Sequence, residues 1–133
     1  MKITLTKADL MKGQTIPAGW YKVDIINFNI KPPKSGGDSL NYVPEFIFPT
    51  LDGFKMEHTF NSQAIGNIGP FIAALSNKPL KQIMDEIKGG NLEFDTDTCV
   101  GKKIQIKIKH EEYQGRMVNK VDGFLPHDAV APF

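Results

Sequence analysis

The stretch that decides the fold is GWYKVDIINFNIK, residues 19–31. Apolar side chains occupy every second position up to Ile25, the period that is typical of a half-buried β-strand. The alternation changes phase at Ile26, after which Phe28 and Ile30 continue it. A bulge or sharp bend near Ile26 would keep both halves of the strand facing one core. The stretch therefore predicts a long, bent strand, as a small closed barrel requires.

The rest of the chain divides into alternating and helical patterns. In order, they predict strands at 40–48 and 54–61, helices at 65–75 and 80–88, and strands at 102–110 and 117–125. The loop after the first strand, PPKSGG at 32–37, cannot form the helix that a split ferredoxin-like fold needs there. The order predicts a mainly β protein: a five-stranded oligonucleotide/oligosaccharide-binding barrel (OB-fold) with a helical segment between strands 3 and 4.

The length of 133 residues suits a single domain with its own core. We expect an N-terminal arm at 1–15, the barrel at 16–126 and a C-terminal tail at 127–133. No apolar run is long enough to cross a membrane, and the N-terminus lacks the apolar stretch of a signal peptide. Cys99 is the only cysteine, so no intramolecular disulfide forms, which favours a reducing compartment.

Charge is distributed unevenly along a chain whose net charge is only +1. Residues 1–34 carry six lysines against two aspartates, and residues 100–120 are equally basic. Residues 35–63 and 80–99 are each acidic, with a net charge of −3. The folded molecule is therefore expected to present one basic and one acidic face, unless the lysines only serve solubility.

Motifs of the common enzyme classes are missing. The sequence has no Gly-x-Ser-x-Gly elbow, no phosphate-binding loop and no His-Glu-x-x-His pair, which predicts no catalytic residue and no cofactor. Cys99, His58, His110 and His127 lack the short spacings of a metal site, so none is predicted. A small enzyme remains a third interpretation, because catalytic groups need only meet in space. A pocket into which several titratable groups converge would favour the enzyme interpretation.

Aromatic and basic side chains alternate on the predicted strands and loops. Binding of single-stranded nucleic acid needs this mixture, since cations follow the phosphates and flat rings stack on the bases. Trp20 has the outward parity, Tyr113 occupies a hairpin tip, and Tyr42 is either a stacking ring or a core residue because it shares the parity of Phe46. The candidate nucleic-acid-binding residues are Trp20, Lys22, Lys31, Lys34, Tyr42, Lys55, Lys103, Lys107, Lys109, Tyr113 and Arg116.

Four short motifs carry a resemblance to a known family. They are IPAGWY at 16–21, KSGGD at 34–38, FIF at 46–48 leading to LDG at 51–53, and YQGR at 113–116 followed by Asn119. In order and spacing they resemble the bacteriophage single-stranded DNA-binding proteins with one barrel domain, over residues 16–126. The resemblance implies sequence-tolerant coating of single strands during phage DNA replication, recombination or repair, in the cytoplasm of the host cell. It also implies contacts from Lys31, the loop at 34–38, Trp20, and Tyr113 with Arg116.

The C-terminal residues offer one more similarity. Many bacterial single-strand-binding proteins end in an acidic tail that closes with Pro-Phe and docks partner enzymes, and this chain closes with Pro132-Phe133 after a single acid, Asp128. The tail is therefore either a docking site for replication or recombination proteins or a loose extension. The competing function is a non-catalytic protein-interaction or structural phage protein that uses the same barrel. Whether the chain forms a homo-oligomer, and whether it prefers DNA or RNA, stays open.

Overall fold

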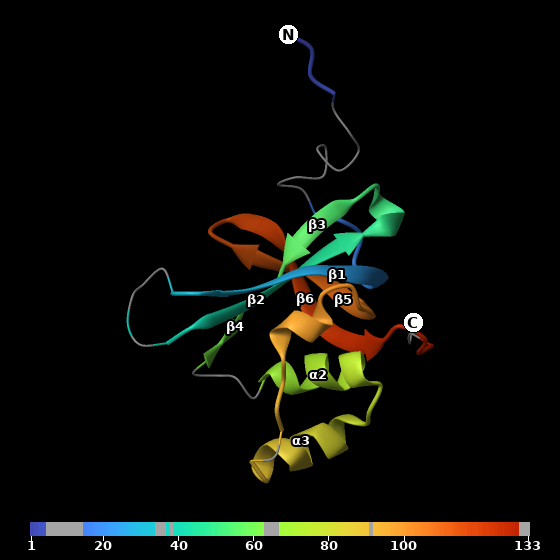
Figure 1. Ribbon diagram of the computed structural model, residues 1–133. Coiled ribbons are helices and arrows are strands. Elements are labelled where there is room, and N and C mark those ends of the chain that lie inside the picture. Colours follow the sequence, from blue (N-terminus) through green and yellow to red (C-terminus); the bar gives the residue numbers. More distant parts are fainter. Residues whose placement is uncertain (5–14, 34–36, 38, 63–66, 91, 131–133) are drawn as a thin grey trace.

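The computed structural model describes residues 1–4, 15–33, 37, 39–62, 67–90 and 92–130. The elements, shown in Figure 1, are β1 (Gly19–Lys31), β2 (Asn41–Phe48), β3 (Phe54–Glu57), β4 (Phe60–Asn61), α2 (Gly69–Ser76), α3 (Leu80–Lys88), β5 (Lys103–Tyr113) and β6 (Arg116–Pro126), with short 3-10 turns at Pro49–Leu51 and Thr96–Cys99. The prediction of a mainly β fold is confirmed.

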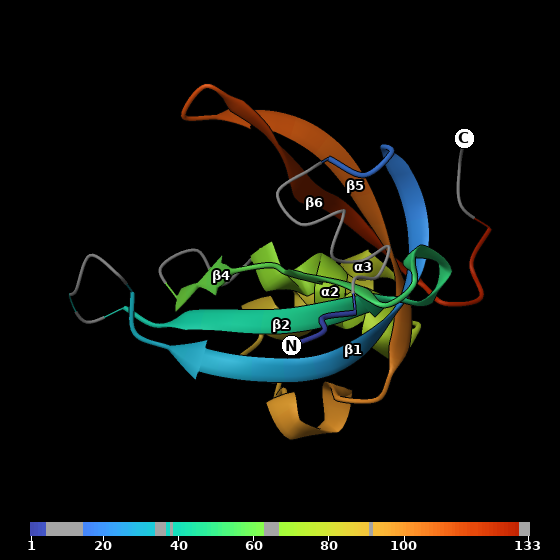
Figure 2. The same ribbon diagram turned by 90° about the horizontal axis from the view of Figure 1, so that it is seen from above.

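The strands form one antiparallel sheet with the order β3-β2-β1-β5-β6, and β4 pairs with β2. The described ranges contain six strands where the sequence predicts five, because the strand expected at 54–61 is interrupted at His58 and Thr59. The backbone N–H of His58 donates to the carbonyl of Pro44 at 3.1 Å before pairing resumes at Phe60. Figure 2 shows the sheet curling so that the far ends of the β1–β2 and β5–β6 pairs project to the same side, with β4 between them.

The long first strand is present with the predicted boundaries. Its first half, Gly19 to Asp24, pairs with β5, and its second half pairs with β2. The register with β2 shifts between Ile25 and Asn27, which places a bulge where the alternation changes phase. This bulge confirms the predicted bend and lets a single strand join both parts of the sheet.

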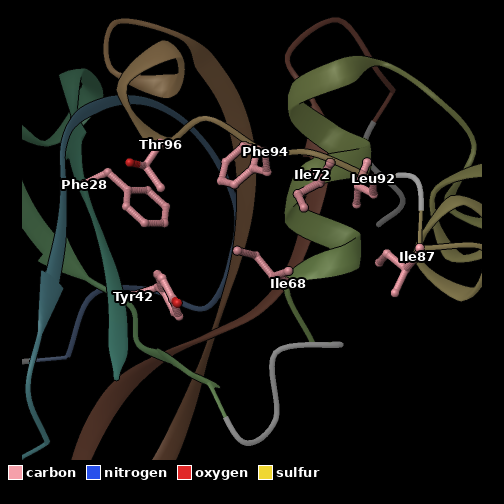
Figure 3. A pocket seen from close by; sticks show the side chains of 9 residues that line it. Phe28, Tyr42, Ile68, Ile72, Ile87, Leu92, Phe94 and Thr96 are labelled. Atoms are coloured by element: carbon pink, nitrogen blue, oxygen red, sulfur yellow. The ribbon is translucent and has the colours of Figure 1, made fainter. Parts of the chain in front are cut away.

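The two helices cover one end of the sheet, with α3 outermost (Figure 1). The helix predicted at 65–75 is observed as α2 from Gly69, with Pro70 in its first turn, where proline is tolerated; residues 63–66 lie outside the described part. A Cβ at Gly69 would come within 2.8 Å of the Met84 sulfur, so α2 and α3 pack closely there. A cavity remains between the helices and the sheet (Figure 3).

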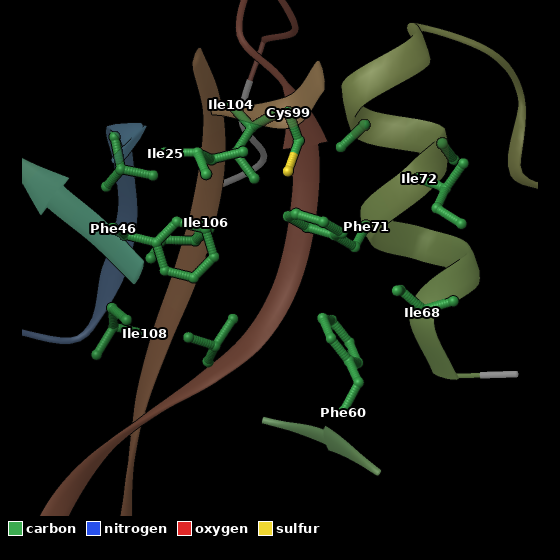
Figure 4. Close-up of a cluster of buried hydrophobic side chains, with 14 of the residues drawn as sticks. Ile25, Phe46, Phe60, Ile68, Phe71, Ile72, Cys99, Ile104, Ile106 and Ile108 are labelled. Carbon is green, nitrogen blue, oxygen red and sulfur yellow. The ribbon is translucent and has the colours of Figure 1, made fainter. Parts of the chain in front are cut away.

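The core lies between the curled sheet and α2. Phe71 points from α2 toward Phe46 on β2 and the isoleucines of β5 (Figure 4), and both phenylalanines have no exposed surface. Ile104, Ile106 and Ile108 point inward as the alternation predicts. The rings of His58 and Phe60 meet Phe124 of β6 at centroid distances of 5.8 and 6.0 Å, so aromatic contacts join the two ends of the sheet.

The segment before β1 is tied to the β5–β6 hairpin through Ile16, which is only 1% exposed. Its N–H donates to the Oδ1 of Asn119 at 2.9 Å, and its carbonyl accepts from the Nε2 of His110 at 2.6 Å. Since His110 and Asn119 are register partners, two neighbouring side chains hold both polar groups of one residue. We call this contact the Ile16 clamp.

The segment after β6 covers part of β5. The alternation assigns Gln105 an outward position, yet it is 4% exposed. Its Nε2 lies 3.1 Å from the carbonyl of Pro126, 3.2 Å from that of His127 and 2.6 Å from that of Ala129. The chain thus folds back over its outer face, so the expected extended tail is wrong for these residues; Pro132 and Phe133 lie outside the described part. No helix in the described ranges is long and apolar enough to cross a membrane.

Candidate nucleic-acid interface

Trp20 lies on the outer side of the sheet, at the start of β1. It is half-buried, and its register partner on β5 is Lys107, which pairs in turn with Gly123 on β6. A Cβ built on Gly123 would lie 3.2 Å from the Cη2 of Trp20. The indole therefore extends across β5 and reaches β6 at the one position on that strand pair that has no side chain. A glycine inside a strand often marks such a close approach.

Basic side chains continue along the same side of β5 from the indole. Paired residues of antiparallel strands point to the same side of the sheet, so Lys107, Lys109 and Lys120 share the face of Trp20. In the described ranges, no carboxylate lies within ion-pair distance of Lys22 or Lys107. Lys109 pairs with Asp122 at 3.2 Å, so its charge is partly compensated.

The hairpin tip carries a ring and a cation. Tyr113 is 63% exposed and pairs with Arg116 across the turn, where Gln114 and Gly115 both have positive φ. Tyr113 has the same parity on β5 as Lys107, so it points to the same face. Tyr113 lies six residues after Lys107 along β5, a distance of about 20 Å. This is long enough for a short stretch of extended polynucleotide to touch Trp20 and Tyr113 together.

We define the Trp20 face as the outer side of β1, β5 and β6. Its members among the predicted site residues are Trp20, Lys22, Lys103, Lys107, Lys109, Tyr113 and Arg116. The sequence reasoning missed Lys120, Gly123 and Gln105 on this side. Gly123 lies inside an alternating strand, and this signal could have identified the position that the Trp20 ring covers. Nothing local indicated Lys120, whose role depends on the register of β5 with β6.

Acidic residues on this side neutralise some of the lysines. Lys103 pairs with Asp24 at 2.8 Å, and Lys120 pairs with Glu111 at 2.8 Å. The hydrogen bond from Lys120 holds the pKa of Glu111 below its usual value. These pairs are solvent-exposed, and such pairs are worth little to stability, but they compensate the charges of two lysines on this face.

The remaining predicted residues lie elsewhere. Lys31 pairs with Glu57 at 3.3 Å near the far end of β1, and Lys55 is exposed on β3, three strands away from β5 in the sheet order. Tyr42 pairs with Phe60 and faces the inner side of the sheet, in a cavity with Phe28, so it is on the opposite side from Trp20. Lys34 lies outside the described residues.

The described residues contain no cluster of three or more side chains that could hold a metal ion. His58 is largely enclosed by Phe60 and Phe124, and burial, together with the charge of Lys120, lowers its pKa from 6.5 to about 4. A neutral imidazole between two rings is a packing group in this position. The chain matches no protein-family model and no curated protein.

Proposed function

We propose that the protein binds single-stranded DNA without sequence preference and without catalysis, in phage DNA replication, recombination or repair. The observation that carries the proposal is the Trp20 face, where two partly exposed rings flank a row of cations on one side of the sheet. Each base stacked on an aromatic side chain contributes about 1 to 3 kcal/mol whatever its identity. The cations add a phosphate term that depends on salt.

The fold supports the same proposal. We infer that the sheet is an OB barrel whose third strand is divided into β3 and β4, with α2 and α3 as the helical segment between strands 3 and 4. In that fold the loops after strand 1 and between strands 4 and 5 flank the binding face. The corresponding ends of β1–β2 and β5–β6 project to the same side of this molecule (Figure 2). The resemblance to phage single-strand-binding proteins rests on the motifs quoted for it.

Electrophoretic mobility shifts with three probes of equal length test the proposal: oligo-dT, a mixed-sequence single strand, and the mixed strand annealed to its complement. We expect both single strands to shift at similar protein concentrations and the duplex to need at least about tenfold more, because its bases are not available for stacking. An RNA probe of the same sequence measures preference between the two nucleic acids. Equal binding to duplex and single strand, or no shift with any probe, would contradict the proposal and favour the protein-interaction alternative.

A further inference from the structure

The cavity on the inner side of the sheet is apolar and has a volume of about 300 Å³. Figure 3 shows Phe28 and Tyr42 on one side, Ile72 of α2 and Ile68 just before that helix on the other, and Phe94 between them. A second, shallower hollow continues from it and shares Tyr42, Phe94 and Thr96. Ile30 lines this hollow and is 52% exposed. The apolar cavity and this partly polar shoulder form one open site on the side opposite to the Trp20 face.

The surroundings of this site are acidic. Glu93 and Asp95 line the shallower hollow, and residues 80–99 have a net charge of −3. A phosphate backbone would be repelled here, which argues against a nucleotide as the occupant. The chemistry fits an apolar side chain that is flanked by a cation.

The chain itself contains such a segment at its N-terminal end. Residues 1–4 read Met-Lys-Ile-Thr, and Ile3 is 75% exposed. The Ile16 clamp ties the following part of the chain to the β5–β6 hairpin. In Figure 1, residues 1–4 lie at the end of the molecule away from α2 and α3. One copy therefore presents an exposed apolar and basic segment at one end and an apolar, acidic-rimmed cavity near the other.

We propose that the cavity of one copy receives Ile3 of a second copy, with Lys2 beside Glu93. Burying one isoleucine side chain contributes about 1.5 to 3 kcal/mol, and the ion pair adds specificity more than affinity. Because donor and acceptor surfaces differ, the contact is heterologous, and repetition gives an open chain of copies or a ring. The contact does not depend on DNA; its consequence, cooperative coating of a long strand, rests on the proposed function.

Site-directed disulfide formation tests the contact directly. Ile3→Cys and Glu93→Cys are prepared as separate proteins, one with a mass tag, and are mixed under a mild oxidant. We expect disulfide-linked heterodimers. Cys99 should stay silent, since it is 1% exposed and burial raises the pKa of its thiol. The matched control is Lys78→Cys, in the turn between α2 and α3, mixed with Ile3→Cys. Equal yields from both mixtures would overturn the proposal.

Self-association without DNA separates this inference from the proposed function. Sedimentation of the unlabelled protein should show association that Ile3→Asp weakens by about tenfold or more. Lys2→Glu should weaken it too, and combination with Glu93→Lys should restore it. A protein that stays monomeric at all concentrations overturns the contact. An intramolecular disulfide in a chain that carries both Ile3→Cys and Glu93→Cys overturns it too. Both outcomes count against the contact whether or not a short oligonucleotide binds. Binding of a short oligonucleotide should be unchanged in Ile3→Asp.

Discussion

Among single residues, the position of Trp20 depends on Gly123, because a glycine has no side chain to block the indole. The indole reaches across β5 because no side chain stands on β6 beneath its outer edge. The backbone angles at Gly123 are ordinary, so the glycine is needed for space and not for conformation. The ring is thereby supported on one side and partly exposed to solvent, which is the arrangement that base stacking requires.

Removing the ring should weaken binding without unfolding the domain. We expect Trp20→Ala to raise the dissociation constant for oligo-dT about tenfold, since one stacked base is worth 1 to 3 kcal/mol. Trp20→Phe keeps a flat ring and should lose much less. Fluorescence anisotropy of a labelled oligonucleotide measures both constants, and circular dichroism checks the fold. A Trp20→Ala protein that is folded and binds as tightly as the wild type would remove the indole from the interface.

His58 should make stability depend on pH. Its pKa is lowered to about 4 from 6.5, so the folded state keeps the ring neutral while the unfolded state binds a proton first. Stability contributed by the neutral ring is complete above pH 6.5 and is lost as the pH falls toward 4, by at most about 3 kcal/mol. Urea unfolding of wild type and His58→Gln at several pH values checks this. The wild type should lose more stability over that window; parallel curves would show that the ring is not enclosed.

At the scale of elements, local patterns predicted β1 and α3 with their observed boundaries. Alternation and an adjacent Pro-Gly turn determine β1, while an apolar stripe ending in Gly89-Gly90 determines α3. The break between β3 and β4 was not predictable, because it depends on a hydrogen bond from His58 to Pro44 on another strand. Gln105 has outward parity but is buried by a segment more than twenty residues later in the chain.

The candidate site is likewise only partly predictable from local patterns. Parity predicted Trp20 and the lysines of β5 on one side, and the turn residues predicted an exposed Tyr113. Tyr42 could not be assigned, because only the pairing of β2 with β4 shows that it faces inward with Phe60. The sequence also could not show which lysines are compensated by carboxylates, since each of these ion pairs joins two different strands.

The Ile16 clamp should contribute to the stability of the sheet. Asn119→Ala removes the acceptor for the Ile16 N–H, and a buried donor without its partner costs about 1 to 3 kcal/mol. The free energy of unfolding from urea titration measures the loss. Asn27→Ala, at an exposed position of β1, is the matched control and should change stability by less than about 0.5 kcal/mol. Equal effects of the two substitutions would mean that the clamp is not formed in solution.

At the scale of the whole molecule, a net charge of +1 means that binding must come from a local group of cations. On the Trp20 face, Lys22, Lys107 and Arg116 have no ion-pair partner among the described residues, whereas Lys103 and Lys109 do. Each phosphate neutralised contributes about −0.7 to the slope of log K against log salt concentration for a single strand. Three free cations therefore predict a slope of about −2.

The salt slope separates free from compensated cations. Arg116→Ala should reduce its magnitude by about 0.7, while Lys103→Ala, which removes a lysine already paired with Asp24, should change it much less. Titrations at four or more salt concentrations give the slopes. A wild-type slope near zero would contradict phosphate contacts, and equal effects of both substitutions would contradict the division of the face into free and paired lysines.

In the proposed function, an unpaired strand meets rings and cations on one side of the curled sheet. Because Trp20 is the only tryptophan, its emission reports directly on that face. Titration of the wild-type protein with oligo-dT at low salt should quench the emission to a plateau, and added salt should reverse the quenching. Emission that stays constant while anisotropy shows the oligonucleotide fully bound, or an oligonucleotide that never binds, would contradict the account.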